Sequence, residues 1–77
     1  MEKLIATLKK KYDNQISEIS QSGIAEINIQ LKEGIESASF IQNLQNHFVE
    51  LVDELTIVKI NIIDANGNQI DSFASNQ

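Results

Sequence analysis

Hydrophobic residues recur every three or four positions over the first 20 residues of the chain. This spacing places them on one side of an α-helix, because a helix turns once in about 3.6 residues. Asp13 and Asn14 interrupt the pattern, but it continues beyond them, and Gly23 offers a stop. We therefore predict a first helix over residues 2–20. Its hydrophobic positions are Met1, Leu4, Ile5, Leu8, Tyr12, Ile16 and Ile19.

Hydrophobic residues recur at every second position over residues 24–31. Ala25, Ile27, Ile29 and Leu31 alternate with polar residues in this segment. Such alternation is typical of a strand with one face in the core and the other in water. The segment therefore predicts a strand over residues 24–31.

A second helical period covers residues 37–54. Ser37 or Ser39 suits its N-terminal cap, because a short hydroxyl side chain accepts a hydrogen bond from the first turn. At 1.5 Å per residue the helix would span about 27 Å, which matches the ~26 Å of an eight-residue strand. Its hydrophobic positions are Phe40, Ile41, Leu44, Phe48, Leu51, Val52 and Leu55.

Residues 56–64 and 68–74 predict a β-hairpin. The Asp64-Ala65-Asn66-Gly67 segment suits a type I turn followed by glycine in the left-handed conformation. Alternate Asp and Asn residues here also resemble the start of a calcium-binding loop. The glycine and the terminal glutamate of such a loop are missing from their positions, so we interpret the segment as a turn.

The turn type sets the register of this hairpin. A type I turn with the glycine bulge pairs Ile62 with Ile70 and Ile60 with Ser72. A two-residue Asn-Gly turn would instead pair Ile63 with Ile70. We favour the first register because it keeps four hydrophobic residues on one face. These are Val58, Ile60, Ile62 and Ile70.

The element order predicted for the 77 residues is α-β-α-β-β, in one domain. Each helix has one hydrophobic stripe, and a small sheet supplies a surface for both. We therefore expect an α/β (α+β) two-layer sandwich, with two helices on one face of a three-stranded sheet that ends in a hairpin. The connection through the second helix should be right-handed if the strands it joins are parallel. The strand order stays open.

The opposite face of this sheet is expected to carry Ile57 and Ile63 beside Lys59 and Asn61. A half-apolar face is typical of a subunit contact, although single exposed isoleucines are also common. We therefore take Ile57, Lys59 and Ile63 as a candidate oligomer interface, as in a homodimer. A partner chain would help so small a domain, whose own core is marginal.

Charge is unevenly distributed along the chain, whose net charge is −5 at pH 7. Residues 1–12 contain four lysines and one glutamate, whereas residues 13–77 contain two lysines and ten carboxylates. An acidic surface repels nucleic acid and anionic membranes, so we expect direct contact with neither. The lysine run at residues 9–11 would fan across the solvated side of a helix, without arginine to read phosphates or bases.

The composition favours a cytoplasmic protein. There is no cysteine, and no apolar run approaches the ~18 residues that a membrane span needs. The apolar stretch Leu4–Leu8 is too short for a signal peptide, and three lysines follow it. The 13 isoleucines, 8 asparagines and absent arginine suggest an AT-rich coding sequence, as in a low-GC bacterium or its phage.

Residues for catalysis are nearly absent. His47 is the only histidine, and no cysteine accompanies it, so neither a nucleophilic mechanism nor an all-protein transition-metal site is expected. We interpret His47 as a half-buried residue at the edge of the second helix's stripe. The sequence therefore predicts no enzyme activity, no cofactor and no metal.

Three carboxylates, Glu50, Asp53 and Glu54, gather near the predicted C-terminal end of the second helix. The helix dipole is negative there, and like charges one turn apart repel each other. A group that breaks a stability rule in this way is a candidate partner interface. We therefore expect a non-enzymatic acidic protein-binding protein: an inhibitor or regulator, antitoxin-like or anti-defence in type. It would occupy a basic surface of a larger protein. The alternative is a structural subunit joined through the open sheet face.

Overall fold

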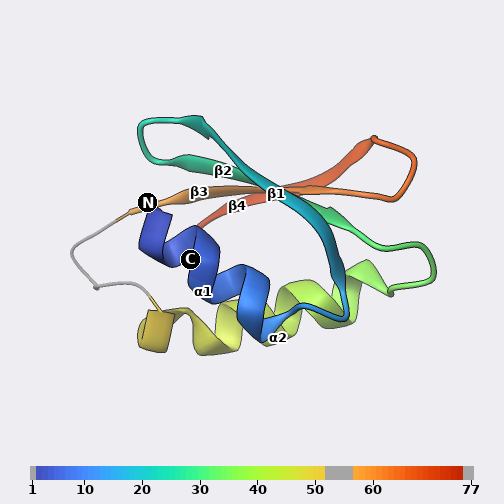
Figure 1. The fold of residues 1–77 in the computed structure, drawn as a ribbon, viewed down its shortest axis with the longest axis horizontal. Helices are drawn as coiled ribbons and strands as arrows, with labels where there is room; N and C mark the ends of the chain where they lie inside the picture. The colour runs from blue at the N-terminus through green and yellow to red at the C-terminus, as the bar shows by residue number, and fades with distance from the viewer. Residues whose placement is uncertain (1, 52–56, 76–77) are drawn as a thin grey trace.

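The protein is a small α+β domain in which two helices lie against one face of a four-stranded sheet (Figure 1). The computed structural model describes residues 2–51 and 57–75. The predicted fold class is confirmed, but the predicted sheet lacked one strand. In chain order the elements are α1 (Glu2–Lys11), β1 (Ile16–Gly23), β2 (Glu26–Leu31), α2 (Ser37–Leu51), β3 (Lys59–Ile63) and β4 (Gln69–Ala74).

The strands follow one another across the sheet in the order β1-β2-β3-β4. β1 and β2 are antiparallel, as are β3 and β4, whereas β2 and β3 run parallel. Helix α2 connects the parallel pair, which is the role predicted for the second helix. The sheet therefore consists of two hairpins joined along the β2–β3 pairing.

The prediction of one helix over residues 2–20 is wrong beyond Lys11. The chain turns at residues 12–15, where the Tyr12 carbonyl accepts hydrogen bonds from the N–H groups of Gln15 and Ile16, both at 2.9 Å. It then enters β1 and pairs with β2. The element order is consequently α-β-β-α-β-β.

A β-bulge explains why β1 has the spacing of a helix. Ile16 and Ile19 are three residues apart, so a regular strand would place them on opposite faces. The register of β1 against β2 shifts between Ile16 and Glu18, and the extra residue returns Ile19 to the core side. Three-residue spacing from a bulge is indistinguishable, in sequence, from one turn of a helix.

The β3–β4 turn has the predicted form. Gly67 has a φ of +93°, which favours glycine, and its N–H donates to the Asp64 carbonyl at 3.0 Å. The Asp64 carboxylate accepts from the N–H groups of Asn66 and Asn68, both at 2.9 Å. This oxygen is thereby committed to the turn.

The predicted hairpin register is wrong beyond Ile63 and Gln69, the pair next to the turn. The register shifts between Ile62 and Ile63, so that Ile62 lies opposite Asp71 and Ile60 opposite Phe73. The predicted pairs Ile62–Ile70 and Ile60–Ser72 are therefore not formed. The two-residue turn, with Ile63 opposite Ile70, is not formed either, because Ile63 pairs with Gln69.

The register shift buries an aromatic side chain in place of an aliphatic one. Phe73 is 6% exposed and packs edge-on against Phe48, with ring centroids 6.2 Å apart. Ile70, which was predicted on the core face, is 44% exposed. An aromatic side chain removes more apolar surface from water than isoleucine does, so this exchange favours the bulged register.

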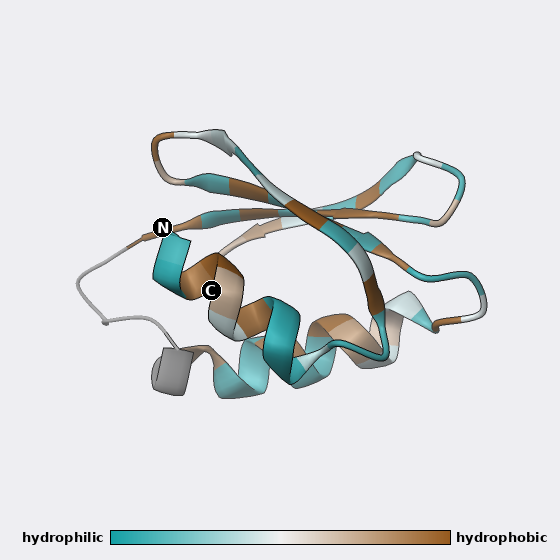
Figure 2. Ribbon diagram, viewed as in Figure 1, coloured by the Kyte–Doolittle hydropathy of each residue, from teal (hydrophilic) through white to brown (hydrophobic). Residues whose placement is uncertain are grey.

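The core lies between the sheet and the two helices. Figure 2 shows apolar and polar residues alternating along the strands, as expected for a sheet with one covered face. None of the helices in residues 2–51 and 57–75 is long and apolar enough to cross a membrane. The buried hydrophobic residues are Leu8, Tyr12, Ile16, Ile27, Ile29, Leu31, Phe40, Leu44, Phe48, Val58, Ile60, Ile62 and Phe73.

Candidate functional site

The sheet face opposite the helices carries a network of polar side chains centred on Asn61 of β3. Although none of the described helices and strands covers this face, Asn61 is only 4% exposed. Its Nδ2 donates to Oε2 of Glu26 at 2.6 Å and to Oδ1 of Asn28 at 2.8 Å. Its Oδ1 accepts from the Ser72 hydroxyl at 2.9 Å. Neighbouring side chains, rather than another layer, bury this amide.

The directions of these hydrogen bonds follow from the chemistry of the partners. An ionised carboxylate only accepts, so the amide nitrogen of Asn61 must face Glu26. Asn28 Oδ1 also accepts from the Ser22 hydroxyl at 3.3 Å. The network thus connects β1 through Ser22, β2 through Glu26 and Asn28, β3 through Asn61, and β4 through Ser72.

A shallow hollow of about 200 Å³ lies beside this network. Gln30 Nε2 donates to the Asp64 carbonyl at 3.2 Å, which leaves the Gln30 amide oxygen without a described donor. The hollow combines a carboxylate, a hydroxyl and amide groups with one aliphatic wall. Its lining residues are Glu18, Ser20, Asn28, Gln30 and Ile63.

The residues of the candidate oligomer interface are on this same open face. Ile57 is 56% exposed, Lys59 is exposed and Ile63 is half-buried. Strand alternation places Lys59 and Ile63 on the side of Asn61, and Ile57 continues the same alternation before β3 begins. The buried polar side chain of Asn61 lies between them, so the two isoleucines form no continuous apolar patch.

The candidate carboxylate interface falls largely outside the described residues. Glu50 lies in the last turn of α2, at the end of the domain where β3 begins (Figure 1). Its side chain, together with Asp53 and Glu54, is not part of what the structure describes. The proposed role of this group stays a prediction.

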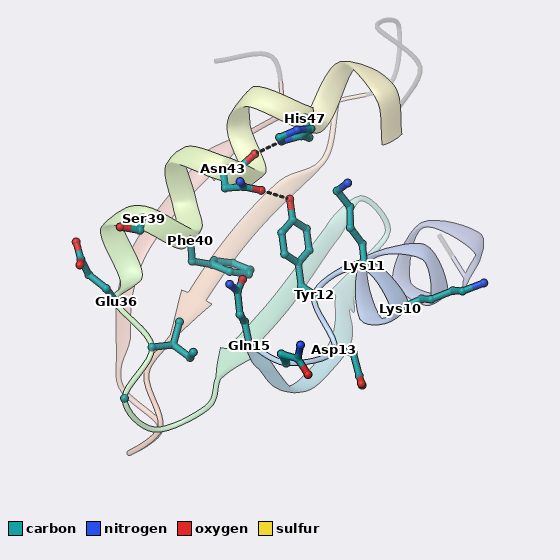
Figure 3. A pocket seen from close by; sticks show the side chains of 13 residues that line it. Lys10, Lys11, Tyr12, Asp13, Gln15, Glu36, Ser39, Phe40, Asn43 and His47 are labelled. Atoms are coloured by element: carbon teal, nitrogen blue, oxygen red, sulfur yellow. Dashed lines mark hydrogen bonds between the residues drawn. The ribbon is translucent and has the colours of Figure 1, made fainter.

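A groove of about 790 Å³ separates the end of α1 and the following turn from α2 (Figure 3). The Tyr12 hydroxyl donates to Oδ1 of Asn43 at 2.9 Å and so connects the turn to the helix. The Tyr12 ring also packs edge-on against Phe40, with centroids 5.1 Å apart. These contacts hold the turn at a fixed distance from α2, with the groove between them.

His47 lies at the rim of this groove. Its Nδ1 is 2.8 Å from the Asn43 carbonyl oxygen. A carbonyl only accepts, so Nδ1 carries the proton and Nε2 is the second ring nitrogen available to a ligand. The prediction of a half-buried flanking residue is confirmed.

Within the described residues, no three His, Asp or Glu side chains come together as a metal site. The polar network and the groove were both missed in the sequence. The network joins residues as far apart in the sequence as Glu26 and Asn61, and its only signal was one or two polar residues contributed by each strand. Recognising it required the β2–β3 pairing, which the sequence left open, and the β3–β4 register, which places Asn61 opposite Ser72.

The chain was compared with protein-family models, curated proteins and solved structures, and no match was found in any of the three.

Proposed function

We propose that this chain is a non-enzymatic protein-binding protein, an inhibitor or regulator that occupies a basic surface of a larger partner. The open sheet face is the docking surface, and the hollow at Glu18 is its recognition site. The observation that carries the proposal is the chemistry of this hollow. A carboxylate, a hydroxyl and an amide oxygen surround a space with the Ile63 side chain as its wall.

A lysine or arginine side chain of the partner has the matching chemistry. Its charged end has only hydrogen-bond donors, which Glu18, Ser20 and Gln30 can accept. Its aliphatic stem can pack on Ile63 while the charge stays near the rim. A hydrogen-bonded charge pair of this kind gives direction as well as attraction.

The charge distribution supports the same kind of partner. Residues 13–77 carry ten carboxylates against two lysines, so the protein attracts a basic surface over a long range. Complementary charge raises the association rate and selects among partners. The carboxylates Glu50, Asp53 and Glu54 belong to the same proposal as a second contact.

The hydrogen-bond network favours binding without rearrangement. Asn61 and Asn28 are already fixed by their neighbours, and an ordered surface loses less entropy when it docks. A polar centre of this kind suits an interface with a separately folded partner, because such interfaces resemble ordinary protein surface in polarity.

The proposal is tested by capturing the partner from the source cells with tagged protein and measuring the affinity of the purified pair. Glu18→Lys should weaken binding at least about tenfold, or about 1.4 kcal/mol, because it places a cation in the hollow. Glu33→Lys makes the same charge change on an exposed loop and is the matched control. Wild-type affinity should fall steeply with salt.

An equal loss of affinity in the two variants would mean that overall charge alone explains the weaker binding. This result would contradict the role of the hollow. Glu50→Lys combined with Glu54→Lys tests the second contact separately. Unchanged binding in that double variant would remove this group from the interface while leaving the hollow in place.

The second candidate function is that of a structural subunit joined to another copy through the same face. The exposure of Ile57 and its position on the same side as Ile63 favour this alternative. Sedimentation velocity over a range of concentrations tests it. A self-associating protein should become monomeric with Ile57→Asp, whereas a wild-type monomer at the highest concentration would exclude self-association.

A further inference from the structure

The groove between α1 and α2 contains polar groups whose hydrogen-bonding capacity is only partly used. It lies between α2 and the end of α1 with the turn that follows it (Figure 3), so it is separate from the open sheet face. The side chains that matter for its chemistry are Lys11, Tyr12, Gln15 and Asn43.

Asn43 has two unused donors. The Tyr12 hydroxyl donates to Oδ1 of Asn43 at 2.9 Å, which fixes the amide with its oxygen toward Tyr12. The Nδ2 group therefore faces away from this bond, and it donates to no residue that the structure describes. These two N–H groups are available to an acceptor that enters the groove.

Lys11 provides the positive charge. Its Nζ lies 5.9 Å from the centroid of the Tyr12 ring, and this cation–π contact is its only interaction with the described residues. In Figure 3 the ammonium extends along the groove toward His47, whereas the carboxylates of Asp13 and Glu36 point away from Tyr12 and Asn43. The whole lining has two lysines and two carboxylates, and Lys11 is the charged group that lies against Tyr12.

Gln15 provides an acceptor that lacks a donor. Its Oε1 is buried, and no donor among residues 2–51 and 57–75 reaches it. A buried acceptor without a hydrogen bond is unfavourable, so a ligand that supplies an N–H gains from meeting it. Gln15 is half-buried and is one of the residues that line the groove.

We propose that the groove binds a carboxylate that carries an amide N–H one carbon away, as in the C-terminal end of a peptide or a small N-acyl amino acid. The carboxylate accepts from Lys11 Nζ and Asn43 Nδ2, and the adjacent N–H donates to Gln15 Oε1. A carboxylate paired with a cation and two amide donors forms charge-assisted hydrogen bonds, which are the stronger kind.

The test is an NMR titration of the ¹⁵N-labelled full chain with N-acetylglycine, using N-acetylglycinamide as the neutral counterpart. Saturable shifts of the amides at residues 11–15 and 39–47 are expected with the acid, at a Kd of about 1 mM, which is reasonable for eight heavy atoms. The neutral amide should cause no saturable shifts. Acetyl-Ala-Ala-Gly with a free carboxylate distinguishes a peptide C-terminus from a small N-acyl amino acid as the ligand, because a peptide site binds it more tightly than N-acetylglycine.

Two variants test the assigned atoms. Lys11→Met removes the charge at an exposed position, and Lys9→Met makes the same change on α1 outside the groove. Asn43→Asp replaces the two donors by an acceptor but keeps the oxygen that Tyr12 binds. Lys11→Met and Asn43→Asp should each weaken binding at least tenfold, and Lys9→Met should not.

Saturable shifts that Lys11→Met abolishes and Lys9→Met preserves would support the site. The proposal is overturned if the acid causes no saturable shifts, if the neutral amide binds equally well, or if Lys11→Met binds like the wild type. Lys11 is exposed, so this variant gives a result even where Asn43→Asp disturbs the fold.

Discussion

Asn61 occupies a position where a sheet normally exposes a side chain to water, yet it is almost completely buried. Its amide makes three hydrogen bonds to side chains of the two neighbouring strands. One of them goes to a carboxylate, and hydrogen bonds to charged groups contribute more than neutral ones. A single asparagine thus connects β2, β3 and β4 on the face that the helices leave open.

Asn61→Ala should lower the free energy of unfolding by about 1–3 kcal/mol, because it removes the three hydrogen bonds of a buried amide, one of them to the half-buried carboxylate of Glu26. Urea denaturation followed by circular dichroism measures the change. Asn46→Ala, at an exposed site of α2, is the control and should be neutral or slightly stabilising, because alanine favours a helix. If Asn61→Ala lowers the free energy of unfolding by less than about 0.5 kcal/mol, hydrogen bonds to water replace those of the network without loss of stability.

The elements show what the sequence could and could not predict. β2 and α2 were predicted because each keeps one period, with Ile27, Ile29 and Leu31 buried in the strand and Phe40 in the helix. β1 was not predicted, because its bulge gives isoleucines the spacing of a helix. Such a bulge is defined by the neighbouring strand, so it cannot be recognised from β1 alone.

The β3–β4 register was also predicted wrongly because of a bulge, and two substitutions test the observed register. Phe73→Leu should lower the free energy of unfolding by about 1 kcal/mol or more, because it removes buried surface and the contact with Phe48. Ile70→Ala should change it by less than about 0.5 kcal/mol, since Ile70 is largely in solvent. The register without the second bulge requires the opposite ranking, so urea denaturation of both variants distinguishes the two.

The edge of β4 is protected by a side chain. β4 has one neighbouring strand, and the Ser75 N–H bonds to the Val58 carbonyl of that side. Alternation then directs the Ser72 N–H outward, where Oδ1 of Asp71 accepts it at 2.7 Å. A charged side chain that occupies an edge donor hinders the addition of another strand.

Asp71→Ala should therefore increase self-association, because it frees this donor at an exposed edge. Sedimentation velocity at several concentrations measures the effect. Glu33→Ala removes the same charge from a loop and corrects for the lower repulsion between molecules. If the two variants associate equally, the carboxylate acts through charge alone and not by occupying the edge.

Across the whole molecule, positive and negative charges are segregated. Three of the six lysines end α1, whereas ten of the eleven carboxylates follow residue 12. The carboxylates of residues 13–77 therefore repel one another. The basic end of α1 lies beside the groove in the helical layer. This separation lets one small domain present an acidic surface over most of the chain and a basic helix end at α1.

Salt should stabilise this protein, because it screens the repulsion among the carboxylates. Raising the ionic strength from about 0.01 M to about 0.15 M shortens the screening length from about 30 Å to about 8 Å. The urea midpoint should rise over this range with the slope of the transition unchanged. A falling midpoint would instead show that attraction between α1 and the acidic part outweighs the repulsion.

The parallel pairing of β2 with β3 also determines how the chain can fold. Each hairpin pairs residues that are near in the sequence. Glu26 pairs with Lys59, and the whole of α2 lies between them in the sequence. Contacts between distant residues lose more entropy on closing, so this pairing is expected to form late, after the two hairpins. Once formed, it lies at the centre of the sheet, away from both edges. The backbone amides shared by β2 and β3 should then exchange with deuterium most slowly in the domain, and those of the outer strands should exchange earlier through local opening.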